Sequence, residues 1–213
     1  MSYIGKTPTS VPLTSSDITD GIISLPKLTD GTDGNIISYD ASGNPVAVAT
    51  GTDGQVLTST GAGSPPAFET LPTNTPAFFA HANGNQTIAT SSYTKVEIDT
   101  EIVDTNSKFD VANYRFTPAE VGYYIIGGFV RFDSSTTTSD CGIIIYKNGS
   151  AYYKHVEGKS SVTTKHINQV VYLDADDYVE LYCYQNGGGN QDINGAGSLD
   201  TVAATFYGYK ILT

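Results

Sequence analysis

A 20-residue glycine-rich repeat is the feature that most restricts how this chain can fold. Its two copies cover residues 31–50 and 51–70, and both begin with Gly-Thr-Asp-Gly. Asp-Gly is a common turn sequence, and the runs NIISY and QVLTS that follow are typical of short strands. Each copy is therefore expected to form a turn, a strand, a second turn and another strand.

The repeat has too few apolar side chains to fold by itself. An isolated β-hairpin is marginally stable in water, and a single-chain solenoid needs about three or more copies of its unit. Other copies of the same chain, arranged around a symmetry axis, would supply the missing burial. We therefore expect residues 31–75, which end in a linker rich in Pro and Thr, to form a trimeric stalk.

The segment before the repeat, residues 1–30, is rich in Pro, Ser and Thr. Its apolar residues are scattered, so they cannot bury much surface against one another. We expect an extended arm that becomes ordered by docking on a larger body. The apolar side chains available for docking are Ile4, Ile22, Ile23, Leu25 and Leu28.

Residues 76–213 are expected to hold the main hydrophobic core. They contain every aromatic residue except Tyr3, Tyr39 and Phe68, and a packed core needs large apolar side chains. Short alternating runs follow one another, Asn148-Gly149 is a strong hairpin turn, and no long segment has a helical period. The pattern predicts an all-β sandwich or jelly roll.

The net charge of −11 excludes several classes of partner. Residues 1–75 carry two Lys against seven Asp and Glu, and residues 76–213 carry nine Lys and Arg against 15. Without a basic cluster, binding to nucleic acid or acidic lipid is not expected. The chain also lacks an apolar run of about 20 residues and a secretory signal, so we expect cytosolic synthesis and no membrane insertion.

The two cysteines, Cys141 and Cys183, are too far apart for a CxxC site. In a reducing compartment we expect two buried free thiols on strands. A disulfide is the alternative, because both residues lie in apolar alternations that could face one core.

Catalytic motifs are missing from the sequence. His81, His155 and His166 are isolated, and neither HExxH nor GxSxG occurs. Residues 186–190, NGGGN, lack the GK[ST] ending of a phosphate loop and are interpreted as a flexible strand connector. We expect no enzymatic activity and no cofactor. A depolymerase, the alternative, would need paired carboxylates that do not emerge.

One acidic turn could hold a metal ion. Asp174, Asp176 and Asp177 are closely spaced carboxylates, which suit Ca²⁺. The alternative is a solvated acidic turn, because the full EF-hand spacing is absent.

Tyrosine is unusually frequent, with 15 residues and no Trp. Its apolar ring and polar hydroxyl suit subunit interfaces and the recognition of saccharides or proteins. We expect the adjacent pair Tyr152–Tyr153 to place one ring on each face of a strand, and the core or a subunit interface to take most tyrosines. The candidate receptor-binding residues are Tyr152, Tyr153, Asn186 and Asn190.

The order of features in residues 76–213 resembles the C1q/tumour-necrosis-factor jelly roll. Ala119-Glu120 departs from the small apolar pair that is commoner there. The resemblance implies a compact homotrimer with both termini at one end, and it makes calcium near the axis more plausible. The matching segments are PAFFAHANGNQTI, Phe109-Asp110, Tyr114–Pro118, Val121–Tyr124, Tyr146–Gly149, Asp177–Leu181 and Thr205–Gly208.

The repeat resembles a different family. GTDGQVLTSTGAGSPPAF is similar to the GxxGQVLxSxGxG repeat of bacteriophage tail fibres, and the opening SYIGKTP is similar to the attachment region of such proteins. The resemblance implies a homotrimeric virion fibre, assembled in the bacterial cytoplasm. The arm would dock on tail, portal-vertex or capsid proteins, and the C1q-like head would bind a host-surface glycan or protein. The alternative is a capsid decoration or head-fibre protein that stabilises or adorns the shell.

Overall fold

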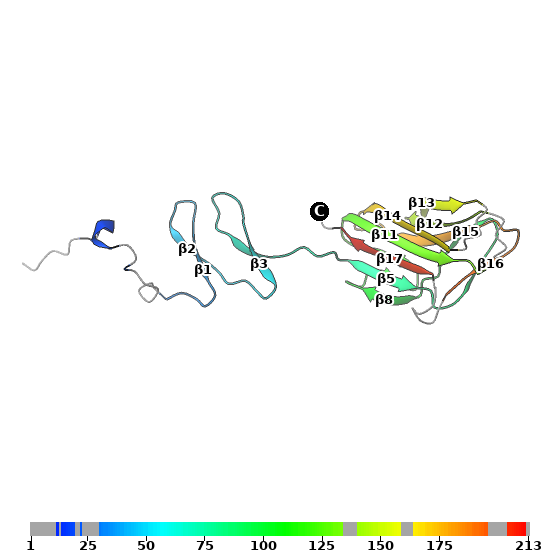
Figure 1. Cartoon of the computed structure of the whole chain (residues 1–213), viewed down its shortest axis with the longest axis horizontal. Coiled ribbons are helices and arrows are strands. Elements are labelled where there is room, and N and C mark those ends of the chain that lie inside the picture. The colour runs from blue at the N-terminus through cyan, green and yellow to red at the C-terminus, as the bar shows by residue number, and fades with distance from the viewer. Residues whose placement is uncertain are drawn as a thin grey trace, which may run out of the picture. The chain divides into compact units, whose positions relative to one another are not determined.

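A computed structural model of the chain divides it into two compact units, Met1–Leu71 and Pro72–Thr213 (Figure 1). We refer to them as the N-terminal and C-terminal units. The described residues are Pro12, 14–19, Ile22, 30–133, 140–158, 164–195 and 204–211.

The described part of the arm contains one 3-10 turn, η1 (Ser15–Asp17). The Asp17 carboxylate accepts a hydrogen bond from the backbone N–H of Thr14 at 2.7 Å, which closes this turn. Ile22 is exposed. The other expected docking residues lie outside the described residues, so docking by the arm stays a prediction. They are Ile4, Ile23, Leu25 and Leu28.

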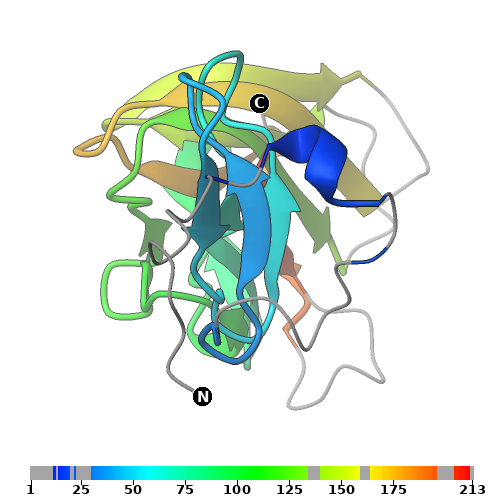
Figure 2. The ribbon, with the colours of Figure 1, turned by 90° about the vertical axis from the view of Figure 1, so that its left-hand side faces the viewer.

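Each copy of the repeat forms an antiparallel hairpin (Figure 1, Figure 2). In the first, β1 (Ile36–Tyr39) pairs with β2 (Pro45–Val48). In the second, β3 (Gln55–Thr58) pairs with β4 (Ala67–Thr70). The predicted turns and strands are therefore present.

The two hairpins do not pair in the same register. Ile37 is opposite Ala47, whereas its counterpart Leu57 is opposite Phe68 instead of Ala67. Pro66 has no N–H to donate to a ladder, and β4 begins directly after it. The loop of the second hairpin, between Thr58 and Ala67, is therefore longer than the loop of the first, between Tyr39 and Pro45.

These hairpins leave most of their apolar side chains in solvent. Val48 is the one buried apolar residue among the described residues of the N-terminal unit. Ile37 is 65% exposed and Tyr39 is 63% exposed. Leu57, at the position equivalent to Ile37, is also exposed.

Two antiparallel sheets form the body of the C-terminal unit (Figure 1). Sheet I has the order β14-β11-β17-β5-β8, and sheet II has the order β13-β12-β15-β10-β9, with β7 also paired to β15. The bounds in sheet I are β5 (Ala77–His81), β8 (Thr100–Asp104), β11 (Gly122–Arg131), β14 (Thr164–Leu173) and β17 (Thr205–Lys210). Those in sheet II are β7 (Ser92–Lys95), β9 (Phe109–Asp110), β10 (Arg115–Phe116), β12 (Cys141–Lys147), β13 (Ser150–Glu157) and β15 (Val179–Gln185).

A short ribbon, β6 (Gln86–Ile88) paired with β16 (Gln191–Ile193), covers one end of the sandwich. From β11 onward the chain crosses between the sheets four times, from β11 to β12, β13 to β14, β14 to β15 and β15 to β17, as in a jelly roll. The predicted all-β jelly-roll class is therefore confirmed.

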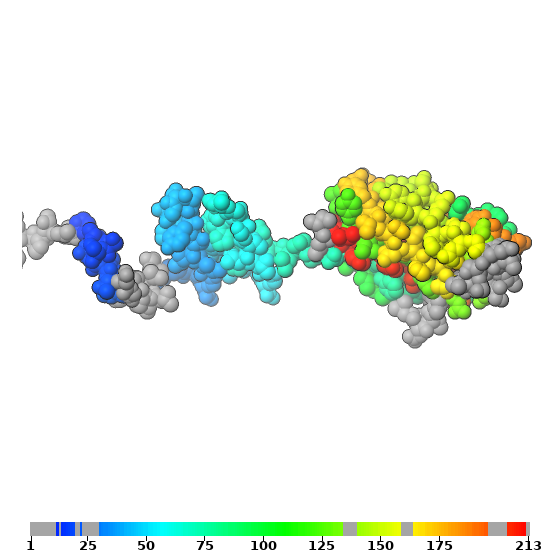
Figure 3. Space-filling model, turned by 45° about the horizontal axis from the view of Figure 1, so that its top comes forward, coloured from blue at the N-terminus to red at the C-terminus, as the bar shows by residue number. Residues whose placement is uncertain are grey.

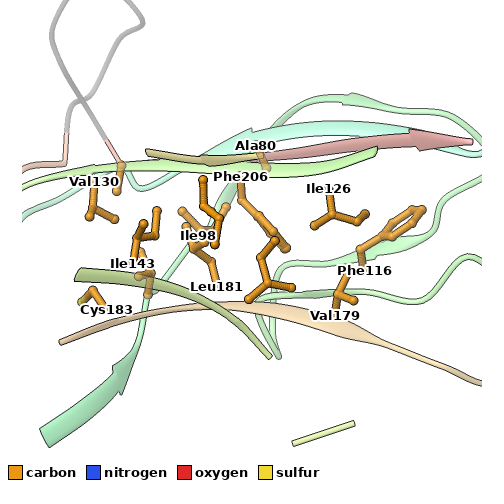
Figure 4. Packing of buried hydrophobic residues seen from close by; sticks show 14 of the residues in the cluster. Ala80, Ile98, Phe116, Ile126, Val130, Ile143, Val179, Leu181, Cys183 and Phe206 are labelled. Atoms are coloured by element: carbon orange, nitrogen blue, oxygen red, sulfur yellow. The ribbon is translucent and has the colours of Figure 1, made fainter. Parts of the chain in front are cut away.

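The core lies between the two sheets and is centred on Phe78. The Phe78 ring centroid lies 4.4 Å from that of Phe116 and 4.9 Å from that of Phe109. Figure 4 shows Phe116 and other apolar side chains filling the space between the sheets. Gly128 allows close contact here, since a Cβ on it would lie 2.7 Å from Leu181 Cδ1.

Both cysteines point into this core. Cys141 on β12 and Cys183 on β15 are buried and free. This agrees with the prediction of two buried free thiols on strands. Burial raises the pKa of the Cys183 thiol to about 12.

Candidate recognition site

The C-terminal unit has two distinct ends. The chain enters β5 at one end, where the Lys210 N–H donates to the Pro76 carbonyl at 3.2 Å. We call this end the base. The opposite end, formed by residues 82–91 and 186–195, carries the β6–β16 ribbon, and we call it the apex.

The tyrosine pair Tyr152–Tyr153 lies on the base side of strand β13. All eight residues of this edge strand are exposed, and its yellow atoms lie on the surface in Figure 3. The prediction of one ring on each strand face is wrong, because the two rings meet edge to face with centroids 4.8 Å apart. A register shift between Ile145 and Tyr146 on the neighbouring β12 accompanies this contact.

Asn186 lies at the apex, and its polar groups are already engaged by Asp140. Its Oδ1 accepts from the Asp140 N–H at 2.7 Å, and its Nδ2 donates to Asp140 Oδ2 at 3.3 Å. Asn190, at the far end of the same loop, is exposed. Asn186 therefore holds the loop in place, and Asn190 is the better placed of the two for recognition.

The four candidate receptor-binding residues are not brought together. The asparagines lie at the apex and the tyrosines lie toward the base, at opposite ends of β12. Seven residues of β12 separate these ends, which corresponds to roughly 20 Å at about 3.3 Å per residue. A single small ligand cannot contact both pairs within one chain.

The apical loop Asn186–Asn190 is tied down, unlike the flexible connector that the sequence suggested. The side chain of Gln185 is 99% buried and donates from Nε2 to the carbonyls of Ile88 and Gly189, at 3.0 and 2.9 Å. Its Oε1 accepts from the Gly187 N–H at 2.7 Å. One buried amide thus fixes both sides of the loop.

The acidic turn at the base is held by protein donors. Asp177 accepts from Lys147 Nζ at 2.7 Å, from Asn148 Nδ2 at 2.6 Å and from the Asp174 N–H at 2.8 Å. Burial opposes ionisation of Asp177, but these donors outweigh it and lower its pKa to about 2. Asp174 and Asp176 are exposed. A cation here would compete with Lys147, and the described residues gather no group of three potential ligands from His, Cys, Asp and Glu.

The histidines are dispersed in the described part of the chain. His81 is buried beside the Ala82 carbonyl. His155 and His166 are exposed, with ring centroids 6.4 Å apart. His155 Nε2 contacts Glu157 at 3.1 Å.

Sequence reasoning missed a buried cation, Lys165. It is 2% exposed, and its Nζ donates to Glu157 Oε2 at 2.7 Å. The hydrogen bond from Lys165 is the main cause that lowers the pKa of Glu157. A signal was present, because Lys165 shares the inward alternation of Ile167 in the run TKHINQVVYL.

The outer face of sheet I carries exposed aromatic and aliphatic side chains, which we call the aromatic face. Tyr123 is opposite Tyr172, and their ring centroids are 5.3 Å apart. Val170 and Tyr209 lie on either side of Ile125 on the same face. Tyr123 is 49% exposed and Val170 is 52% exposed. This is a contiguous apolar surface outside the core of the unit.

No protein-family model matches the chain. It is 32% identical over 130 residues to the uncharacterised protein YqcC of Bacillus subtilis strain 168, covering 55% of this chain and 36% of YqcC. It is 28% identical over 137 residues to XkdV, a protein of the phage-like element PBSX of the same organism, covering 55% of this chain and 20% of XkdV. The chain thus spans about a third or less of these relatives.

Solved structures are similar to this chain at low sequence identity. The PRD1 vertex protein P5 matches with a TM-score of 0.50 and 15% identity, covering 66% of this chain and all of that chain. The globular domain of zebrafish complement 1qA matches with a TM-score of 0.47 and 16% identity, covering 64% of this chain and 98% of that domain. No helix in the described residues is long and apolar enough to span a membrane.

Proposed function

We propose that this chain is a non-enzymatic structural protein of a phage or phage-like particle. In this proposal it forms a homotrimeric fibre, anchored by its N-terminal arm, whose C-terminal unit binds a host-surface glycan or protein. The similarity to XkdV, a protein of a phage-like element, supports the particle assignment. The aromatic face carries the proposal of self-association, because it is an apolar surface that the single chain leaves exposed.

The partner surface for the aromatic face is the edge strand β13 of a second copy. This strand exposes Tyr152, Tyr153 and Val156, and an uncovered apolar edge invites pairing or packing. A face that packs on a different surface of the next copy forms a heterologous contact, which closes into a ring when the rotation allows. The C1q/tumour-necrosis-factor resemblance sets the expected number of copies at three.

The hairpins of the N-terminal unit have the same need for partners. Their exposed Ile37 and Leu57 occupy equivalent positions of the two copies of the repeat. Packing of these side chains around a shared axis would bury what a single chain cannot. The repeats would then form the stalk, and the apex would lie at the end of the C-terminal unit away from the anchored arm.

The mass of the full chain in solution tests self-association. Light scattering should give three times the 22.6 kDa of one chain, and a monomer would contradict the proposal. Tyr123→Glu should weaken the trimer because it places a charge in the aromatic face. Val111→Glu is the control, since Val111 is 38% exposed and directly follows β9, at the opposite edge of sheet II from β13.

Two further experiments test the role on the particle. The purified full chain should bind host cells and block adsorption of the particle, and failure to do either would contradict receptor binding. Immunogold labelling should place the protein on the tail. Label on the shell would support the alternative role of capsid decoration.

A further inference from the structure

Two of the three glycines in the apical loop could not be replaced by a residue with a side chain without strain, and the third could. A Cβ on Gly187 would lie 2.2 Å from Gln191 Nε2, and Gly188 has a φ of +83°. Gly189 has neither restriction: its φ lies outside the left-handed region, and no atom lies within 4 Å of its Cβ position. The fold therefore does not require glycine at position 189.

The backbone around Gly189 is nevertheless fixed. Gln185 Nε2 donates a hydrogen bond to the Gly189 carbonyl at 2.9 Å, and the Gly188 N–H donates to Thr90 Oγ1 at 3.3 Å. Gly188, Gly189 and Asn190 are exposed. Gly188 and Gly189 thus present fixed and exposed backbone without side chains, which allows a ligand to approach the main chain closely. Close approach of a ligand would explain a glycine at position 189, where the fold itself would accept a side chain.

A second observation at the same place indicates a missing hydrogen-bond donor. Gln191 is 7% exposed and lies directly against Gly187. In the described part of the chain its Oε1 is buried without a hydrogen-bond partner. A buried acceptor without a donor is unfavourable. A donor from outside the chain, such as a hydroxyl or a water that bridges to one, would satisfy it.

We propose that the apical loop binds a neutral, hydroxyl-rich glycan. The sugar would lie against the backbone of Gly188–Asn190, and the Gln191 side chain, which borders Gly187, would turn on binding so that its unpartnered Oε1 accepts from one hydroxyl. The groups that hydrogen-bond the loop are the amide of Gln185, the hydroxyl of Thr90 and the Asp140 carboxylate, so an anionic sugar would meet no cation among them. This inference rests on the proposed receptor role and specifies the class of receptor.

The test uses the full chain on an array of neutral and acidic bacterial polysaccharides. Wild type should bind neutral polysaccharides, and Gly189→Val should lower the affinity at least tenfold without changing the melting temperature. Ala175→Val, which adds bulk at the exposed turn of the base, should bind as wild type. Wild-type binding to acidic polysaccharides alone, binding to none, or full binding by Gly189→Val would overturn the proposal.

Gln191→Met provides an independent variant of similar length. Removing the unpartnered acceptor should leave the melting temperature unchanged or raise it, while affinity for the neutral polysaccharide falls at least tenfold. Retained affinity would remove Gln191 from the site.

Adsorption assays separate the two proposals. If wild type and Gly189→Val block adsorption equally, the apical site is wrong and the receptor role stands. If wild type does not block adsorption, the receptor role itself fails.

Discussion

The two units of this chain are both built from antiparallel strands but differ in what covers their apolar side chains. In the C-terminal unit, Phe78 is covered by rings from both sheets. In the N-terminal unit, Ile37 and Tyr39 point into solvent. Hairpins become a stable domain when a second layer covers them. The C-terminal unit has this layer within one chain, and the N-terminal unit needs it from other chains.

The largest effect should come from the centre of the covered layer. Phe78→Ala removes the ring that contacts Phe109, Phe116 and Phe206, so it should lower the free energy of unfolding by about 3–5 kcal/mol. Chemical denaturation followed by tyrosine fluorescence measures this unit, because it holds every tyrosine except Tyr3 and Tyr39. A loss below about 1 kcal/mol would show that the core is not centred on Phe78.

A smaller loss of stability is expected at the apex, where the buried amide of Gln185 stabilises the structure through hydrogen bonds to the backbone. Gln185→Leu would leave the Gly187 N–H and the carbonyls of Ile88 and Gly189 without their partner. The free energy of unfolding should fall by about 1–3 kcal/mol, and amide exchange at Gly187 should accelerate. Gln55→Leu in the N-terminal unit is the control, since Gln55 makes only exposed hydrogen bonds. Equal losses of unfolding free energy in both variants would show that the buried amide of Gln185 contributes no more than the exposed amide of Gln55.

Acid should weaken the C-terminal unit through Glu157. Its folded pKa lies below the ordinary value of 4.5, chiefly because Lys165 donates a hydrogen bond to it. Such a carboxylate contributes stability above pH 4.5 that is lost as the pH falls through its folded pKa. Wild type should therefore lose melting temperature below pH 4.5 more steeply than Glu157→Gln. Parallel curves would show that the pair contributes nothing.

The smallest effect on unfolding is expected for a change in the uncovered hairpins. Ile37→Ser should alter the free energy of unfolding of the C-terminal unit by less than about 0.5 kcal/mol. It should still weaken the proposed trimer, which analytical ultracentrifugation at decreasing concentration would detect. An unchanged association constant would show that Ile37 does not lie at a contact between chains.

Local patterns in the sequence predicted much of this architecture. The turn at Asn148-Gly149 joins β12 and β13 as expected, and the alternation of β11 and β14 places their inward residues in the core. These features depend on residues near one another in the chain, where turn chemistry and strand period act directly.

The rest depended on contacts between distant residues. Asn186 looked available for recognition, but its amide is engaged by Asp140, 46 positions away. Gln185 resembles any polar residue at a strand end until its bond to Ile88, 97 positions away, is seen. Single-sequence patterns carry no information about such pairs, so the hydrogen bonds that fix the apical loop could not be predicted.

The position of β5 in sheet I has a mechanical consequence. This strand is the first of the C-terminal unit, it runs from base to apex, and it is paired on both sides, to β17 and to β8. Tension between the N-terminal arm and a ligand held at the apex would act along the strand, so that its ladder hydrogen bonds are loaded in shear and resist together. Single-molecule pulling between the N-terminus and an apical attachment point would measure this resistance. A tether that enters through a doubly paired strand can transmit load to the whole sheet without peeling its first strand away.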